Sequence, residues 1–140
     1  LMLMCFIACR APKTPFLAII SPEPINYMGA PQEWLKAIIA VETGGGSTYN
    51  KNEPLAAGIL QQYPIFVRDV NRILGKQVYK LEDRNDPAKA IAMFWTYQQH
   101  YNPEMSFERM ARIQAGGPDG WKQSCTDKYF NLVRNKLFNS

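Results

Sequence analysis

The chain has 140 residues, of which 46% are hydrophobic and 12% aromatic, and its formal net charge is +4. This length and composition fit one globular domain with a single core and exclude a disordered tail. The positive charge suits an anionic polymer such as a cell-wall glycan. The basic residues are scattered along the chain and form no run, so we expect no nucleic acid partner.

Residues 1–9 are almost wholly apolar, and Arg10 ends the run. The run is too short to span a bilayer as a helix, so it predicts a secretory leader. Phe6-Ile7-Ala8-Cys9 resembles a bacterial lipobox, which makes Cys9 a lipidation candidate and a point of membrane attachment. The alternative is an apolar arm packed on the domain. The predicted location is the cell envelope, as a periplasmic protein or an outer-membrane lipoprotein, or outside the cell.

Residues 10–30 are rich in proline, which fixes φ and removes backbone donors, so they predict an extended tether. The folded domain is expected over residues 31–140. Pro31 opens the first predicted helix, in which Leu35, Ile38 and Glu42 share a face at helical spacing. The glycines at 44–46 end this helix.

The rest of the chain predicts a small β-hairpin followed by four helices. Turn-forming residues around short apolar pieces indicate the hairpin over residues 47–63. The first two of these helices span about 64–74 and 87–101. The third begins after Ser106 and stops at the glycines at 116–117, and the fourth begins after Thr126 and carries apolar residues as far as Leu137. Asp86, Ser106 and Thr126 are the expected N-caps of the last three. The fold class is therefore mainly α, with about five helices and a small hairpin.

Glu42 is the most informative residue, because it ends an apolar helical run directly before a glycine break. The negative end of the helix dipole disfavours a charged carboxylate there, and partial burial acts in the same direction. Both effects raise the pKa towards neutral pH, as a general acid for glycosidic cleavage requires. The alternative is a solvated carboxylate at the end of a helix.

The cysteines and the histidine suggest no metal site. With Cys5 and Cys9 in the leader, Cys125 is expected to be an inert thiol. His100 has no cysteine or histidine cluster around it, so neither a metal nor a cofactor is expected.

Three motifs in this order resemble the lysozyme-like superfamily. Glu42-Thr43-Gly44-Gly45 and Ala57-Gly58-Ile59-Leu60-Gln61 are similar to the Glu-Ser-Gly and Gly-Leu-Met-Gln motifs of soluble lytic transglycosylases and goose-type lysozymes. The segment 111–120, Ala-Arg-Ile-Gln-Ala-Gly-Gly-Pro-Asp-Gly, resembles a pattern of the invertebrate-type lysozymes. So does Thr126-Asp127-Lys128-Tyr129-Phe130. The resemblance covers about residues 31–138.

The resemblance implies an α+β lysozyme-like fold in which helices and a hairpin flank a glycan groove. It implies cleavage between N-acetylmuramic acid and N-acetylglucosamine, with Glu42 as the acid/base. It also implies that Gln61 lies on the cleft wall and that Tyr129 closes the pocket from the last helix. Gln61 can instead be an ordinary polar strand residue, and Tyr129 a core residue.

The chain departs from the family pattern at Ala115, where the family has an asparagine that could hydrogen-bond a sugar N-acetyl group. Gln114 is the neighbour that could replace this contact, although one residue along a helix is a rotation of about 100°. The glycine pair that follows, beginning with Gly116, belongs to the same candidate substrate-binding segment. Ala115→Asn is therefore expected to tighten glycan binding by about 1 kcal/mol.

Two aromatic residues and one further carboxylate complete the candidate site. Trp121 follows the Gly-Gly-Pro-Asp-Gly loop and Tyr49 follows the glycine break, so either ring could stack on a sugar. Glu53 is a candidate second carboxylate, or a turn residue, as the following Pro54 favours. With Glu53 the enzyme would be a two-carboxylate lysozyme. Without it, Glu42 acts alone and the product carries a 1,6-anhydro ring.

The sequence therefore predicts a monomeric enzyme that cleaves peptidoglycan glycan strands, as a lytic transglycosylase or a lysozyme. Two alternatives stay open. The first is a non-catalytic glycan-binding or envelope-assembly module on the same fold, which Ala115 motivates. The second is a small basic helical domain that binds nucleic acid.

Overall fold

The computed structural model describes residues 30–44 and 54–139 of the chain. These ranges contain five α-helices: α2 (Ala30–Thr43), α3 (Pro64–Leu74), α4 (Pro87–Tyr101), α5 (Phe107–Gly116) and α6 (Asp127–Phe138). Three short 3-10 helices connect them, namely η1 (Leu81–Asn85), η2 (Gly120–Lys122) and η3 (Ser124–Thr126). The predicted mainly α class is confirmed. The leader lies outside the described residues, and so does the tether up to residue 29.

Local sequence signals set the boundaries of three helices. Pro64 lies in the first turn of α3, and Gly75 ends that helix in the left-handed region at φ 71°. The Asp86 carboxylate caps α4 by accepting hydrogen bonds from the backbone N–H groups of the second and third helical residues. Ser106 caps α5 through a hydrogen bond from the Arg109 N–H.

Thr126 precedes α6 but does not cap it, so that prediction is wrong. Its backbone is already helical, and its side chain makes no capping hydrogen bond. The hydroxyl of Thr126 instead lies 2.8 Å from each of the carbonyl oxygens of Gly120 and Gln123. Because Thr126 is fully buried, these contacts stabilise the η2–η3 turn rather than the helix end.

The predicted hairpin is not confirmed in the part of the chain that the structure describes. Residues 54–63, here called the wall segment, contain one isolated antiparallel bridge, Ala57 with Gln62, and no strand. Gly58 and Gln61 both have positive φ within the turn that joins the bridged residues. Pro64 begins α3 two residues after the bridge, so the ladder cannot extend on that side.

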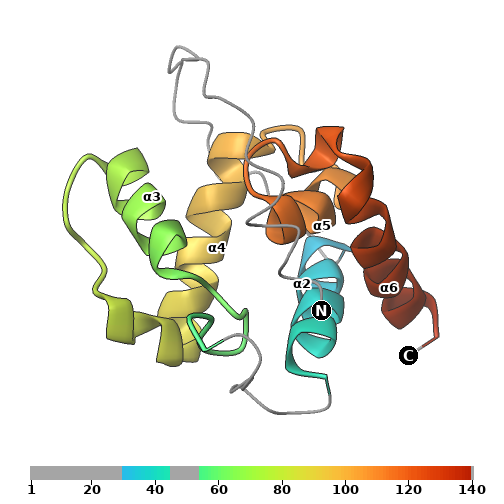
Figure 1. Ribbon diagram of the computed structural model, residues 1–140, viewed down its shortest axis with the longest axis horizontal. Helices are drawn as coiled ribbons and strands as arrows, with labels where there is room; N and C mark the ends of the chain where they lie inside the picture. The colour runs from blue at the N-terminus through green and yellow to red at the C-terminus, as the bar shows by residue number, and fades with distance from the viewer. Residues whose placement is uncertain (1–29, 45–53, 140) are drawn as a thin grey trace.

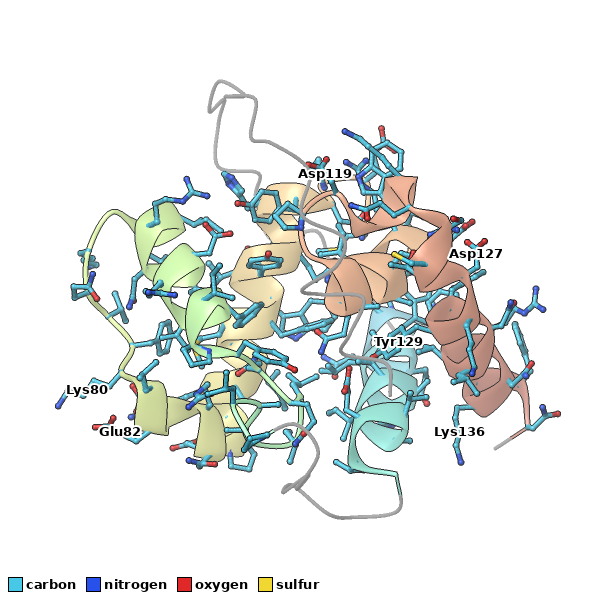
Figure 2. All side chains as sticks on the ribbon, in the orientation of Figure 1. Lys80, Glu82, Asp119, Asp127, Tyr129 and Lys136 are labelled. Atoms are coloured by element: carbon cyan, nitrogen blue, oxygen red, sulfur yellow. The ribbon has the colours of Figure 1, made fainter. Side chains whose placement is uncertain are left out.

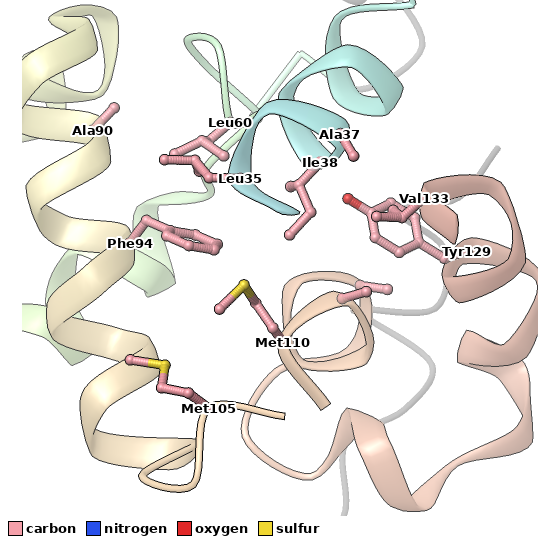
Figure 3. Close-up of a cluster of buried hydrophobic side chains, with 12 residues drawn as sticks. Leu35, Ala37, Ile38, Leu60, Ala90, Phe94, Met105, Met110, Tyr129 and Val133 are labelled. Atoms are coloured by element: carbon pink, nitrogen blue, oxygen red, sulfur yellow. The ribbon is translucent and has the colours of Figure 1, made fainter. Parts of the chain in front are cut away.

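The helices form two groups that meet along the pocket. In Figure 1, α3 and α4 lie side by side, while α6 packs against α2 and α5. Figure 3 shows the larger core cluster, to which α2, α4, α5, α6 and the wall segment all contribute. A second cluster joins α3 and α4 to α5 through Phe66, Val67, Val70, Met93, Tyr97 and Ile113. Burial of these large apolar side chains contributes about 1.5–3 kcal/mol each.

Cys125 is disulfide-bonded, so the expectation of an inert free thiol is wrong. The two other cysteines of the chain, Cys5 and Cys9, lie outside the described residues.

Among the helices of residues 30–44 and 54–139, none is long and apolar enough to cross a membrane.

Candidate active site

Glu42 lies in the last turn of α2 and is held by side chains from two other helices. Its Oε1 accepts a hydrogen bond of 2.5 Å from the Tyr129 hydroxyl on α6. The same oxygen accepts a second hydrogen bond, of 3.1 Å, from Nε2 of Gln114 on α5. The Gln114 amide also donates to the carbonyl oxygen of Leu60 in the wall segment, at 2.9 Å. Three separate parts of the chain therefore orient one carboxyl group.

Burial raises the pKa of Glu42 from its ordinary 4.5 to about 7, although the hydrogen bonds from Tyr129 and Gln114 each lower it. The residue keeps some exposed surface, whereas its carboxyl group is enclosed by protein. No basic residue lies in the last turn of α2 to offset this effect. The predicted direction of the shift agrees with the structure, and the cause is desolvation of the charged form.

Tyr129 reaches Glu42 from the core side. Its ring belongs to the larger core cluster, and the residue is only 4% exposed. Figure 3 shows the hydroxyl pointing from α6 towards α2, and Figure 2 shows the residue between these two helices. Burial raises the pKa of Tyr129 well above 10, and the charge of Glu42 adds to this effect. Tyr129 is thus a core residue that donates a hydrogen bond to Glu42, and it is not among the residues that line the adjacent pocket, which the prediction had it close.

A pocket lies in front of Glu42, between the two helix groups. Its lining includes Glu42 and Gln114, the end of the wall segment, and apolar or aromatic side chains from α3, α4 and α5. The lining residues are Glu42, Gln61, Gln62, Tyr63, Phe66, Tyr97, Ile113 and Gln114. The pocket has about 360 Å³ of empty space, counting the part open to solvent at its mouth.

The structure distinguishes Gln114 from its neighbour Ala115. Gln114 contacts Glu42 and lines the pocket, so the predicted substitute for the family asparagine does face the site. Ala115 is 6% exposed and belongs to the larger core cluster. An asparagine at 115 would therefore place an amide in the apolar core. The expected gain in glycan binding from Ala115→Asn loses its structural basis.

Gly116 and Trp121 are not among the residues that line this pocket. A Cβ on Gly116 would lie 2.8 Å from Cγ2 of Thr126, so the glycine allows close packing of α5 on the following turn. The Trp121 ring has the Arg109 guanidinium 4.2 Å from its centroid and the Lys122 ammonium 5.1 Å away. Both cations therefore lie over the Trp121 ring, which was a candidate for stacking on a sugar.

Gln61 is among the residues that line the pocket, and its contact with a glycan stays a prediction. It has φ of 46°, a strained conformation for a residue with a Cβ, and its Nε2 donates to the carbonyl oxygen of Gly58 at 2.9 Å. Tyr49 and Glu53 lie outside the described residues, so their roles stay predictions.

Five residues that line the pocket are not among the candidates from the sequence, namely Gln62, Tyr63, Phe66, Tyr97 and Ile113. Phe66 and Tyr97 stack with ring centroids 4.6 Å apart and form an aromatic side of the pocket. Neither residue lies on the apolar stripe that the sequence predicted for its helix, so the sequence indicated neither its burial nor its access to a pocket. Gln62 donates from Nε2 to the Ala90 carbonyl at 2.9 Å, and its buried Oε1 has no hydrogen-bond partner among residues 30–44 and 54–139. Nothing in the sequence separates Gln62 from its neighbour Gln61.

A second polar cluster lies next to Tyr97 on α3 and α4. The Tyr101 hydroxyl donates to Asp69 at 2.8 Å and accepts from Arg72 at 2.7 Å, and Arg72 also pairs with Asp69. His100 packs edge-on against Tyr101, and burial followed by the charge of Arg72 lowers the pKa of His100. Residues 30–44 and 54–139 contain no group of three or more potential metal ligands.

The chain matches no protein-family model, no curated protein and no solved structure. The case for a function therefore depends on the geometry and on the motifs. The geometry provides one carboxyl group that stays protonated to about pH 7 and faces a small pocket. Such a group can donate a proton to a leaving oxygen and take one back as the carboxylate.

Proposed function

We propose that the chain cleaves peptidoglycan glycan strands between N-acetylmuramic acid and N-acetylglucosamine, with Glu42 as the general acid/base. The observation that carries this proposal is the buried Glu42 carboxyl group, which holds its proton to about pH 7 at the wall of a pocket. The motif order that resembles the lysozyme-like superfamily supplies the substrate class.

In the proposed reaction, protonated Glu42 gives its proton to the glycosidic oxygen as that bond breaks. The sugar on the other side of the bond develops positive charge at its anomeric carbon. The Glu42 carboxylate then takes the proton of the nucleophile that attacks this carbon. The nucleophile is the substrate's own 6-hydroxyl group in a lytic transglycosylase and water in a lysozyme. Tyr129 and Gln114 stabilise the carboxylate stage, because both donate hydrogen bonds to Oε1.

The transglycosylase route is our first choice. Glu42 is the only carboxylate among the described residues that line the pocket, and a two-carboxylate mechanism needs a second one within about 10 Å. Glu53 is the remaining candidate from the sequence. If it is a nucleophile or base, Glu53→Ala should lower the rate by orders of magnitude, and the products should have reducing ends.

Digestion of purified cell walls, followed by mass spectrometry of the released sugars, tests the proposal. Products with a 1,6-anhydro ring support a transglycosylase, and reducing-end products together with a dead Glu53→Ala variant support a lysozyme. Release of no sugar, with retention of the chain on cell walls, would favour the non-catalytic glycan-binding module. A salt-dependent shift of DNA on a gel would favour the nucleic acid binder.

The buried position of Ala115 bears on the non-catalytic alternative. That alternative was motivated by the missing asparagine, but residue 115 packs in the core and does not line the pocket. The proposed location is the cell envelope or the exterior of the cell, where the substrate is found.

A further inference from the structure

Arg84 binds three backbone carbonyl groups, two of them in the wall segment and one in its own helix η1, and no carboxylate. Its Nη1 donates to the carbonyl oxygens of Leu55 and Gln62, at 2.8 Å each, and its Nε donates to that of Leu81, also at 2.8 Å. Arg84 is partly buried and forms no salt bridge within the described residues. One guanidinium group therefore joins both ends of the wall segment to η1.

The backbone of the wall segment also packs directly against the backbone of η1. A Cβ on Gly58 would lie 1.8 Å from the backbone oxygen of Arg84, so the two backbones are in direct contact there. Gly58 has φ of 78°, which favours glycine on conformational grounds as well. The Gln62 side chain adds a hydrogen bond to the Ala90 carbonyl on α4. The position of the wall segment is thus set by η1 and α4.

This position matters for Glu42 because of Gln114. The Leu60 carbonyl, in the middle of the wall segment, accepts one hydrogen bond from Gln114 Nε2, and the same nitrogen donates to Glu42. If the wall segment moves, Gln114 loses the acceptor that orients its amide. Gln61 and Gln62 would also stop closing the pocket, and water would reach the carboxyl group.

We propose that Arg84 is a positioning residue for the active site, which acts on Glu42 through the wall segment and Gln114. Arg84 does not itself line the pocket, and its only hydrogen bond to a lining residue goes to the backbone carbonyl of Gln62. Only the catalytic readout of this proposal rests on the proposed function, because the protonation of Glu42 can be measured without any substrate.

The groups that face Glu42 define what such a measurement reports. Tyr129 from α6 and Gln114 from α5 contact the carboxyl group. Tyr63 and Tyr97 are the other titratable side chains in the described pocket lining, and no cation is found there. A change in the protonation of Glu42 after substitution of Arg84 therefore reports access of water and loss of the Gln114 contact, since Arg84 is not a neighbour of the carboxylate.

The test is an NMR titration of the Glu42 carboxyl carbon in the full chain, with Glu42→Gln to assign the signal. Arg84→Met keeps the aliphatic stem and removes every donor. Loss of the Gln114 hydrogen bond would raise the pKa of Glu42, but access of water removes the larger effect, which is desolvation, so the pKa should fall from about 7 towards 4.5, by about one unit or more. Arg84→Lys keeps a charged donor and should restore part of the difference. The alkaline limb of cell-wall cleavage should move to lower pH by the same amount.

Arg72→Met is the matched control, because Arg72 also joins neighbouring elements through hydrogen bonds but contacts Asp69 and Tyr101, away from the wall segment. It should leave the pKa of Glu42 unchanged. A folded Arg84→Met variant with an unchanged pKa of Glu42 would overturn the proposal. If that variant does not fold, Arg84→Lys and Gly58→Ala test the proposal in its place. An unchanged pKa of Glu42 in both of these variants would also overturn the proposal. A shifted pKa without cleavage by the wild type would uphold the role of Arg84 and refute the proposed function.

Discussion

Replacement of Glu42 by glutamine should make the protein more stable at neutral and alkaline pH. The folded chain holds the Glu42 proton to about pH 7, whereas the unfolded chain releases it near the ordinary value of 4.5. Below pH 4.5 both states are protonated, so the carboxyl group does not favour either. Between 4.5 and 7 only the unfolded state ionises, which lowers the free energy of unfolding as the pH rises. Above pH 7 both states are ionised, and the loss levels off.

The size of this loss follows from the two pKa values. A difference between 4.5 and about 7 corresponds to about 3 kcal/mol, a large part of the 5–15 kcal/mol that stabilises a typical domain. Glutamine has nearly the shape of a protonated glutamate and does not titrate. The free energy of unfolding of Glu42→Gln therefore does not decrease between pH 4.5 and pH 7 as that of the wild type does. The variant should therefore gain about 3 kcal/mol over the wild type between pH 4 and pH 8.

Urea unfolding of both proteins, followed by tryptophan fluorescence from pH 4 to pH 8.5, measures this difference. Glu33→Gln is the control, because Glu33 lies on the same helix in an exposed ion pair with Lys36, and its loss should change stability by less than about 1 kcal/mol at every pH. A difference between Glu42→Gln and the wild type that does not change with pH would refute the reasoning. It would mean that the Glu42 carboxylate is hydrated in the folded protein.

Four further outcomes follow from the same contacts. Cleavage of cell walls should fall as the pH rises through about 7, because the acid form of Glu42 is consumed; a rate that rises there would contradict its role as the acid. Tyr129→Phe removes a hydrogen bond that lowers the pKa of Glu42, so NMR should show that pKa raised by about one unit. Ala115→Asn should lower the free energy of unfolding in urea by about 1–3 kcal/mol, because it buries an unpaired amide; unchanged stability with tighter glycan binding would return residue 115 to the pocket. Gly75→Ala should cost about 1 kcal/mol in the same assay through its positive φ alone, without change in cleavage.

The helix boundaries could be predicted because their signals are local. Pro64 and Gly75 enclose α3, and Asp86 with the following proline begins α4, without help from the rest of the fold. Thr126 carries the same kind of signal but was misjudged, because its hydroxyl finds carbonyl partners in the preceding turn. Local pattern alone cannot reveal such competition from tertiary contacts.

The candidate site was predictable in its residues more than in its geometry. Glu42, Gln114 and Tyr129 were all named from the sequence, and the structure brings them together. The geometry depends on contacts between elements that are far apart in the chain. Examples are the approach of Tyr129 from the core side and the contacts of Arg84 with the wall segment. A partly buried arginine that binds only carbonyl groups has no sequence signature.

The hydrogen bond between Tyr129 and Glu42 joins residues 87 positions apart, and its donor lies on the last helix of the chain. During synthesis, α2 emerges from the ribosome long before α6, so a growing chain contains Glu42 without its enclosure. Its carboxyl group then ionises like that of any exposed glutamate. The raised pKa of Glu42 can appear only when α6 docks against α2 and α5. If the chain cleaves cell walls as proposed, a chain that is truncated before α6 or still being made would not yet do so.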